Sequence, residues 1–357
     1  MATAPYSYVT DGTSLDRDDF FERVRAFVRD QMLRACATPA HSSSTPPIVI
    51  GFQAPQGFGK TFLLNRLKME LGAGQLLTLS LDDFYFPAEQ LADLASENPS
   101  YWSVRGLPGT HDVQLLRAVL EKVVTRRRAR SLASGASGGE GEEKGEDTSP
   151  LLPRFDKTLR GGRGDRIADG RCQRLSASQL QSVRVVLLEG WCVGFSSDRR
   201  SAPAAADANG GSVEQRQAEP GEVDLDPLYE QGPATRLREQ YEAVWREFIS
   251  AWVIVELPLE VNNLFGSNSA RALRWVVDWR QEAERKQSEA TGRELMTAEE
   301  VEKFCEPYLA CYRRCLPQLY EMGQALAKRQ ASADSAKNIL RAVVQNEKRL
   351  VICLDEG

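Results

Sequence analysis

The chain of 357 residues has no apolar run long enough to cross a bilayer, and it contains only two histidines, His41 and His111. A membrane-spanning helix needs about 20 consecutive apolar residues, so we expect no membrane insertion. A net charge of −5 gives no reason to expect nucleic-acid binding. With 42% hydrophobic and 27% charged residues, the composition is that of a soluble globular protein.

The sequence also lacks the cysteine patterns of a disulfide-bonded domain and of a zinc site. The cysteines are odd in number and scattered along the chain, and no Cys-x-x-Cys occurs. This usage suits reduced thiols. Cys311 and Cys315 are spaced i, i+4 on an expected helix, as two metal ligands could be, but nothing completes a zinc site around them. We therefore predict that the cysteines are packed core residues.

The N-terminal segment lacks the basic-then-apolar pattern of a signal peptide and is rich in aspartate, whereas transit peptides are poor in acids. A cytoplasmic location is the default expectation. Residues 13–36 form an amphipathic pattern typical of a helix. Residues 1–47 are thus predicted to be an N-terminal helix and connector that precede the main domain.

The segment at 54–61 reads Ala-Pro-Gln-Gly-Phe-Gly-Lys-Thr and lies between an apolar run at 48–52 and an amphipathic segment. Strand, glycine-rich turn and helix in this order is the context of a phosphate-binding P-loop. Glycines let backbone N–H groups surround an oxyanion, and the helix N-terminus adds its positive dipole end. Ala54 stands where the pattern has its first glycine, which the loop tolerates if φ there is negative.

Two side chains of this P-loop have predictable roles. Lys60 can reach the β- and γ-phosphates of a nucleotide, and the Thr61 hydroxyl can ligate Mg²⁺. A chance Gly-Lys-Thr in a surface turn is the alternative, but the flanking strand and helix argue against it.

Near-continuous apolar strands alternate with helices along the rest of the chain, which indicates a parallel sheet covered on both faces. Strands are expected at 48–52, 76–81, 183–188, 251–257 and 350–354. The predicted fold class is α/β, a three-layer αβα sandwich of the P-loop NTPase type with a mainly parallel sheet of about five strands and extra helices. One domain would span 48–357, with disordered insertions at 131–150 and 196–223.

Acidic side chains follow the expected strands at 76–81 and 183–188. Ligands of an open parallel sheet bind beyond the carboxyl ends of its strands, so Asp82, Asp83 and Glu189 should meet the P-loop there. Asp82 could accept the proton of an acceptor hydroxyl, and Asp83 or Glu189 could hold Mg²⁺. Taken alone, Asp82 and Asp83 would more simply be a helix cap.

A second group of candidates is mainly basic and lies in glycine-rich loops: Arg105, His111, Lys157, Arg163 and Arg166. Such loops close over bound phosphates and exclude water. Arg163 or Arg166 could stabilise the transferred γ-phosphoryl group. A solvated charged loop is the plain alternative.

Several short motifs of this chain resemble those of a known family. They are Asp-Asp-Phe-Tyr at 82–85, Arg-Gly-Leu-Pro-Gly-Thr-His-Asp at 105–112, Pro-Arg-Phe-Asp-Lys at 153–157, Gly-Asp-Arg at 164–166, Glu-Gly-Trp at 189–191 and Trp-Arg-Gln-Glu-Ala-Glu at 279–284. The first is similar to a motif of the uridine kinase, phosphoribulokinase and pantothenate kinase group. As a set, they resemble the D-glycerate 3-kinase family, including its fungal ATP-dependent kinase-like members. Phe155 stands where that family has tyrosine.

The resemblance implies a catalytic aspartate at Asp82 and roles in acceptor binding or loop closure near Arg105, His111 and Arg166. We assign catalysis to Lys60, Asp82 and Arg166. Nucleotide contacts are assigned to Gly57, Phe58, Gly59, Lys60, Thr61 and Arg163. Acceptor contacts are assigned to Asp83, Arg105, His111 and Lys157, and metal contacts to Thr61 and Glu189.

The predicted function is an ATP- and Mg²⁺-dependent kinase that phosphorylates a hydroxyl of a small molecule, with D-glycerate, giving 3-phosphoglycerate, as the first candidate. A carboxylate on the acceptor would suit pairing with an arginine such as Arg105. One alternative is a kinase of a nucleoside or a pantothenate-like alcohol. The other is a non-catalytic ATP-binding regulatory protein, which would have no need of a base at Asp82.

Overall fold

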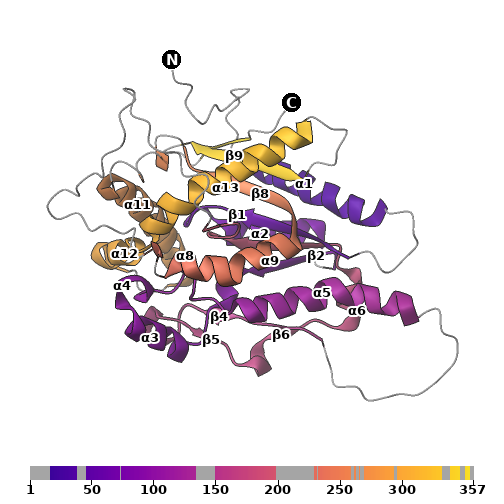
Figure 1. The fold of residues 1–357 in the computed structure, drawn as a ribbon, viewed down its shortest axis with the longest axis horizontal. Helices are drawn as coiled ribbons and strands as arrows, with labels where there is room; N and C mark the ends of the chain where they lie inside the picture. The colour runs from indigo at the N-terminus through magenta and orange to yellow at the C-terminus, as the bar shows by residue number, and fades with distance from the viewer. Residues whose placement is uncertain are drawn as a thin grey trace.

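The helices and strands of the computed structural model are drawn in Figure 1. The residues it describes are 17–37, 46–72, 74–133, 149–197, 229–230, 232–258, 261–262, 265, 269–292, 296–331, 338–345 and 350–353. Most of the insertions predicted at 131–150 and 196–223 lies outside these residues.

A sheet with the strand order β10-β9-β8-β1-β7-β2 forms the centre of the molecule. Its strands are β1 (Ile48–Gln53), β2 (Leu76–Ser80), β7 (Val185–Gly190), β8 (Ile249–Glu256), β9 (Ile339–Gln345) and β10 (Leu350–Cys353). All neighbours pair in parallel except β10, which is antiparallel to β9. The predicted α/β class with a mainly parallel sheet is therefore confirmed.

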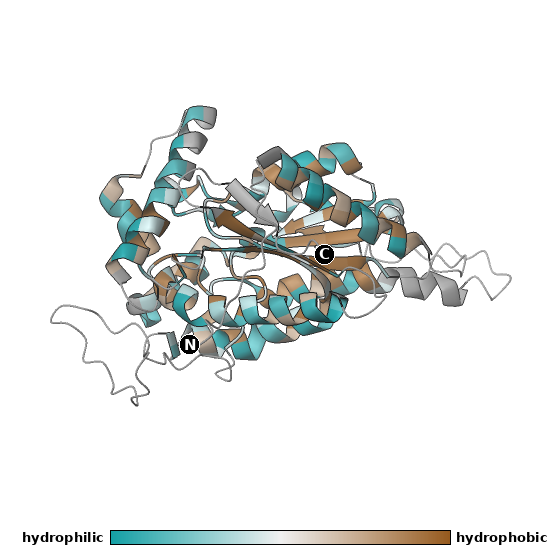
Figure 2. Cartoon of the chain, turned by 90° about the horizontal axis from the view of Figure 1, so that it is seen from above, coloured by the Kyte–Doolittle hydropathy of each residue, from teal (hydrophilic) through white to brown (hydrophobic). Residues whose placement is uncertain are grey.

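Successive residues of each strand point to opposite faces of the sheet, and two apolar cores result. In β7, Val185 and Leu187 belong to one core, whereas Val186 and Leu188 belong to the other. The hydrophobic sheet lies between helices whose outer surfaces are hydrophilic (Figure 2). Burial on both faces explains why the strands read as unbroken apolar runs.

Helices α1 (Arg17–Ala37) and α2 (Lys60–Leu71) cover one face. The other face is covered by α5 (Val113–Ala133), the π-helical turn η5 (Leu237–Tyr241), α9 (Glu242–Phe248) and α13 (Tyr308–Ala331). Phe20, Val24 and Val28 of α1 are buried in the same core as β1. Each such side chain stabilises the fold by roughly 1.5–3 kcal/mol, so α1 is an integral layer of the domain.

The remaining elements gather mostly at one end of the sheet, where β4, β5, α3, α4, α11 and α12 lie in Figure 1. They are η1 (Leu81–Phe84), α3 (Ala88–Glu97), α4 (Pro99–Trp102), β3 (Leu151–Leu152), β4 (Phe155–Asp156), η2 (Arg160–Gly162), β5 (Asp165–Arg166), η3 (Asp169–Arg171), β6 (Gln173–Arg174), α6 (Ala177–Ser182), α8 (Pro233–Arg236), α11 (Ser269–Thr291) and α12 (Ala298–Cys305).

Two helices follow Thr297 in the C-terminal third. Helix α12 ends at Cys305 and α13 begins at Tyr308, with Pro307, which lacks a backbone N–H, between them. The side chain of Thr297 caps α12 in a capping box with Glu300. Strand β9 was not expected; a charged residue, Arg341, stands in its middle and pairs with Glu256 of β8 at 2.6 Å.

Candidate functional site

The P-loop (residues 54–61) joins β1 to α2. Gly57 and Gly59 have φ of 76° and 97°, a left-handed conformation that L side chains rarely adopt, and Gly59 is the N-cap residue of α2. Arg160 is the one non-glycine residue with positive φ in the described part of the chain, so Ala54 does not adopt that conformation. The expectation that the loop tolerates Ala54 is confirmed.

Lys60 folds back over the P-loop. Its Nζ donates to the carbonyl oxygens of Ala54 and Pro55, both at 3.0 Å. Burial lowers the pKa of Lys60, and the nearby carboxylates of Glu189 and Asp82 oppose that shift. The lysine therefore has negative groups close to it, and its ammonium is held on the loop that would carry the phosphates.

The other P-loop residues differ in exposure. The ring of Phe58 packs edge-on against Phe20 of α1 with centroids 5.7 Å apart, so this side chain anchors the loop to the core. The side chain of Thr61 is exposed at the start of α2. Phe58 can contact a nucleotide through its backbone N–H, whereas Thr61 can also offer its hydroxyl.

Helices α11 and α13 both contact the P-loop. A Cβ on Gly57 would lie 2.7 Å from the carbonyl oxygen of Trp279 in α11. The backbone N–H of Gln56 donates to the Tyr312 hydroxyl of α13 at 3.2 Å. These contacts with distant helices fix the loop from two sides and require glycine at position 57.

The carboxyl ends of β1, β2 and β7 meet beside the P-loop. Glu189 of β7 is paired in register with Phe52 of β1 and Ser80 of β2. Its Oε1 accepts a hydrogen bond from Ser80 Oγ at 2.6 Å. Burial raises the pKa of Glu189, and the ammonium of Lys60 opposes the rise. The parallel sheet thus places a carboxylate next to the P-loop lysine.

Asp82 lies in the turn η1 that follows β2. Its Oδ2 accepts from Lys157 Nζ at 2.5 Å, and its Oδ1 accepts from the Tyr85 hydroxyl at 2.8 Å. Burial alone would raise the pKa of Asp82, but the charge and the hydrogen bond of Lys157 outweigh it and hold this pKa well below its usual range. Asp82 is therefore ionised at neutral pH.

Asp83 points elsewhere. Its Oδ1 accepts from the backbone N–H of Phe155 at 3.2 Å, which ties η1 to strand β4. Burial raises the pKa of Asp83, and the charge of Asp82 adds to the rise. Adjacent carboxylates of one turn thus have different surroundings, and only Asp82 contacts Lys157 directly.

His111 is fully buried between two tyrosines. Its ring stacks on Tyr85 with centroids 4.6 Å apart, and Nδ1 lies 2.8 Å from the Tyr241 hydroxyl. Nε2 is buried with no hydrogen-bond partner. Burial lowers the pKa of His111 to about 4, so the ring is neutral at physiological pH. An unsatisfied buried nitrogen is costly, and a polar group of a ligand could satisfy it.

Two of the predicted arginines, Arg105 and Arg166, brace loops. Arg105 Nη1 donates to the carbonyl oxygens of Gly162 and Arg163 at 3.0 and 2.8 Å. Arg166 donates to the Tyr85 carbonyl at 2.7 Å and pairs with Asp112 at 3.3 Å. The side chain of Arg163 is exposed.

One charge cluster is formed by the ionisable side chains of Lys60, Asp82, Lys157 and Glu189 around the neutral ring of His111. Charges within this cluster shift the pKa values of Lys60, Asp82, His111 and Glu189. Asp83 and Arg166 border this cluster through Asp82 and Tyr85, respectively. The roles predicted for all of the site residues, including Arg163, stay predictions.

Sequence reasoning missed three residues that hold the cluster together. Ser80 holds Glu189, Tyr85 holds Asp82, and Tyr241 contacts both His111 and the backbone N–H of Gly109 at 2.9 Å. Tyr85 belongs to a motif quoted above, but Tyr241 lies 130 positions from His111 and carries no local signal. It ends a π-helical turn, an irregularity that is frequent at functional sites.

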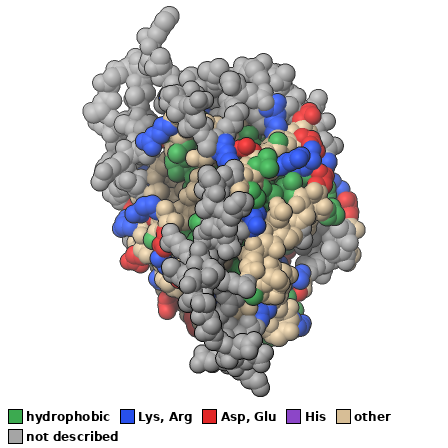
Figure 3. Space-filling view, turned by 90° about the vertical axis from the view of Figure 1, so that its right-hand side faces the viewer, with side chains coloured by type: hydrophobic (Ala, Val, Ile, Leu, Met, Phe, Trp, Pro, Cys, Tyr) green, Lys and Arg blue, Asp and Glu red, His purple; other side chains and the backbone are tan. Residues whose placement is uncertain are grey.

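The described residues also set limits on other kinds of site. They contain no group of three or more His, Cys, Asp or Glu side chains that could hold a metal ion. None of the described helices has the length and hydropathy that crossing a membrane requires. On the face shown in Figure 3, acidic and basic side chains are interspersed among the described residues.

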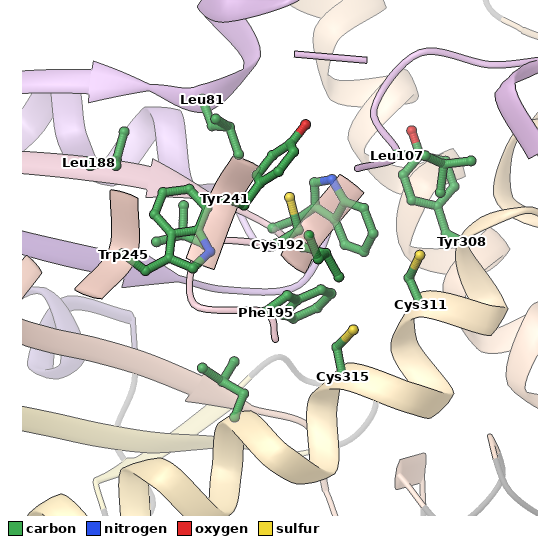
Figure 4. Close-up of a cluster of buried hydrophobic side chains, with 14 of the residues drawn as sticks. Leu81, Leu107, Leu188, Cys192, Phe195, Tyr241, Trp245, Tyr308, Cys311 and Cys315 are labelled. Atoms are coloured by element: carbon green, nitrogen blue, oxygen red, sulfur yellow. The ribbon is translucent and has the colours of Figure 1, made fainter. Parts of the chain in front are cut away.

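Most of the described cysteines are buried. Cys192, Cys305, Cys311 and Cys315 are buried, Cys172 is partly buried and Cys36 is exposed; none of these forms a disulfide. Cys311 and Cys315 point from α13 into the apolar core near Phe195 (Figure 4). Burial raises the pKa of both thiols. They are packed core residues, as predicted for this pair.

Comparison with known proteins gives the class. No family model matches the chain. The chain is 30% identical over 282 residues to the chloroplastic D-glycerate 3-kinase of Arabidopsis thaliana, an alignment that covers 78% of this chain and 50% of that protein. It is 28% identical over 276 residues to the probable ATP-dependent kinase TDA10 of Saccharomyces cerevisiae, covering 75% of this chain and 77% of the relative.

The solved D-glycerate 3-kinase of Cryptococcus neoformans var. grubii has the same fold, with a TM-score of 0.60 at 22% identity over 94% of this chain and 99% of the other. The fold is that of the P-loop kinases, and the homologues of the chain are kinases. The resemblance to the D-glycerate 3-kinase family is confirmed by homologues of that name. The chain spans about half the length of the Arabidopsis protein.

Proposed function

We propose that this protein transfers the γ-phosphate of ATP to a hydroxyl of a small anionic metabolite, and that D-glycerate is the acceptor. The observation that carries the proposal is that the P-loop lysine Lys60 and the ionised carboxylate of Asp82 lie in one charge cluster. A phosphate cradle beside an acceptor for a hydroxyl proton is what phosphoryl transfer requires. The D-glycerate 3-kinase homologues support the choice of acceptor.

The donor side is formed by the P-loop. Backbone N–H groups of residues 57–61 would cradle the phosphates, with Gly57 and Gly59 in the conformations that turn the backbone around them. Lys60 would leave the carbonyl oxygens of Ala54 and Pro55 and bind the β- and γ-phosphates. The dipole of α2 adds positive potential at the same point.

The oxygen atoms near the P-loop fit Mg²⁺. The Thr61 hydroxyl starts α2, and Ser80 holds the Glu189 carboxylate nearby. Mg²⁺ usually binds one or two protein oxygens and takes its other ligands from phosphates and water, so a metal that arrives with ATP needs no larger protein cluster. When bound, the ion would neutralise charge on the phosphates.

The acceptor side is centred on Asp82. The acceptor oxygen attacks Pγ, an O–Pγ bond forms, the bond from Pγ to the β,γ-bridging oxygen breaks, and ADP leaves. The hydroxyl proton passes to the Asp82 carboxylate. A low pKa keeps Asp82 ionised and able to accept the hydrogen bond that orients the hydroxyl. The loose transition state of phosphoryl transfer asks mainly for such positioning.

Basic and polar groups around Asp82 suit an acceptor with a carboxylate. Lys157 Nζ lies 2.5 Å from Asp82 and has further donors. The unpartnered Nε2 of His111 can pair with an acceptor hydroxyl. Arg105 remains the proposed partner of the carboxylate. A nucleoside acceptor carries no carboxylate and would leave Lys157 and Arg105 without an anion to pair with.

A panel of acceptors tests the proposal. ADP release from ATP and Mg²⁺ is measured with D-glycerate, other small hydroxy acids, nucleosides and pantothenate. We expect turnover with D-glycerate to exceed that with the nucleosides by at least about a hundredfold, since a site built to pair with a carboxylate rejects analogues that lack one. Turnover limited to a nucleoside or pantothenate would contradict the acceptor. ATP binding without turnover on any acceptor would favour a regulatory ATP-binding protein.

A further inference from the structure

An arginine of helix α11 lies next to the contact of that helix with the P-loop and near Tyr308, which contacts the loop at 105–112. Neither the charge cluster nor the predicted roles include this arginine. This residue, Arg280, follows Trp279, whose carbonyl oxygen would be 2.7 Å from a Cβ on Gly57. The peptide bond that joins Trp279 to Arg280 therefore lies directly on the P-loop. A cation that begins at this point is within a side-chain length of any phosphate that the loop binds.

The guanidinium group of Arg280 is held on the side of α12 and α13. It lies over the ring of Phe304 at 4.7 Å from the centroid, and its Nη2 pairs with Glu284 one turn along α11. Phe304 in turn packs against Tyr308 with ring centroids 5.4 Å apart. These contacts direct the guanidinium along α11 toward Tyr308.

Tyr308 connects Arg280 to the loop at 105–112. Its hydroxyl donates to the Arg105 carbonyl at 2.6 Å, and the side chain points toward Leu107 (Figure 4). Burial raises the pKa of Tyr308, the charges of Arg280 and Arg105 oppose the rise, and that of Asp82 adds to it. Arg280, Arg105 and Asp82 are thus all near one hydroxyl group.

One donor of Arg280 is unused. Its Nε is buried without a hydrogen-bond partner. Leaving a buried donor of a charged group unpaired is unfavourable, and a short movement toward an oxyanion would satisfy it. The other candidate arginines differ: Arg166 already donates to Tyr85 and Asp112, and the side chain of Arg163 is exposed.

We propose that Arg280 is a further catalytic residue, which binds the transferred γ-phosphoryl group from α11 during its passage from ATP to the acceptor. The proposal rests on the kinase function proposed above. Charge on the phosphoryl oxygens is spread in the transition state, and an arginine supplied from the same chain stabilises it. Phe304 and Glu284 hold this guanidinium beside Tyr308, which contacts the loop at 105–112, so a movement of the side chain toward the P-loop would bring it to the phosphoryl group.

The test compares Arg280→Gln with two variants on the same helix. Arg280→Gln is expected to lower kcat by about 10²–10³-fold while the Kd for ADP stays within threefold. Binding of ADP with tetrafluoroaluminate and Mg²⁺, which mimics the transferred phosphoryl group, should weaken by a similar factor. Arg285→Gln is the matched control, because Arg285 is half-exposed and pairs only with helix neighbours Glu282 and Glu289; it should change neither quantity.

Glu284→Gln separates catalysis from packing. It removes the ion pair but keeps the guanidinium over Phe304, so we expect kcat to fall less than fivefold. Equal losses of kcat in Arg280→Gln and Glu284→Gln, with equal falls in Tm, would show a structural ion pair and overturn the proposal. Unchanged binding of ADP with tetrafluoroaluminate in Arg280→Gln would also overturn it.

A failure of the kinase function gives a different result. Wild-type protein would then show no acceptor-dependent turnover and would bind ADP with tetrafluoroaluminate no more tightly than ADP. The contact with the γ-phosphate is still measurable in that case, as the ratio of the Kd values for ADP and ATP. Arg280→Gln should weaken ATP binding and leave ADP binding unchanged, so the Kd for ADP divided by the Kd for ATP should fall at least tenfold. An unchanged ratio would reject Arg280 as a γ-phosphate ligand.

Discussion

The proposed donor and acceptor halves of the site are built in opposite ways. The donor half is one continuous segment, the P-loop at 54–61, shaped by its own glycines and by the start of α2. The acceptor half is assembled from Asp82, His111, Lys157 and Tyr241, which come from separate parts of the chain. A local segment can be recognised in a sequence, whereas an assembled cluster depends on the fold around it.

The largest effects should come from the lysine of each half. Lys60→Met removes the ammonium group that would bind the phosphates of ATP. We expect kcat to fall about 10²–10³-fold, with weaker ATP binding. Lys157→Met removes the partner of Asp82, and the main effect should be a higher KM for the acceptor. Steady-state kinetics with each substrate varied in turn would measure both. Equal effects of the two variants on the KM for ATP would contradict the assignment of Lys60 to the donor half and Lys157 to the acceptor half.

Alanine variants of one glycine in each half introduce a steric clash into the loop of that half. Alanine at Gly57, with φ of 76°, would approach the Trp279 carbonyl to 2.7 Å; at Gly106, with φ of 117°, it would approach the Tyr308 hydroxyl to 1.9 Å. Each change should destabilise the fold by about 2–5 kcal/mol. Gly57→Ala should weaken ATP binding, and Gly106→Ala should raise the KM for the acceptor.

The control for this pair is Gly72→Ala at the end of α2. Its φ is 84°, but nothing lies within 4 Å of the added Cβ. Only backbone strain remains, so the loss should be about 1–2 kcal/mol. Urea unfolding of the variants gives the free energies. If Gly72→Ala costs as much stability as the other changes, the packing of Trp279 and Tyr308 against the loops is not the cause.

Lys157→Met should also move the pH profile. In the native protein the pKa of Asp82 lies below its ordinary value, so Asp82 stays ionised as the pH falls and does not limit activity. Without Lys157, burial is opposed less and the pKa of Asp82 rises. The acid limb of kcat/KM should therefore shift to higher pH in the variant. An unchanged acid limb would argue against Asp82 as the proton acceptor.

The smallest effect at neutral pH concerns stability through His111. Its folded pKa is about 4, below the unfolded value of 6.5, so the unfolded chain binds more protons between these values. Stability is full above pH 6.5 and falls by up to roughly 3 kcal/mol as the pH drops toward 4. His111→Phe should flatten this slope in urea unfolding from pH 7 to 4.5. A slope that persists in the variant would assign the effect to other groups.

The parts of the fold and of the site that could be predicted from the sequence are those that depend on local segments. The P-loop, most parallel strands and the positions of Asp82 and Glu189 at strand ends were predicted, because each depends on local pattern. Strand β9 was missed because the buried pair of Arg341 with Glu256 hides its apolar character. Tyr241 and Arg280 were given no role, because their importance lies in contacts with distant loops.

Asp82→Asn tests the central claim most directly. This variant keeps the shape of the side chain and removes the proton acceptor. The measurement is transfer of labelled γ-phosphate from ATP to D-glycerate, with ATP binding determined on the same preparations. We predict labelled 3-phosphoglycerate from the wild-type protein, a loss of at least about 10²-fold in the variant, and a Kd for ATP within threefold of wild type. Transfer that is unimpaired in Asp82→Asn, or absent in the wild-type protein, would contradict the account.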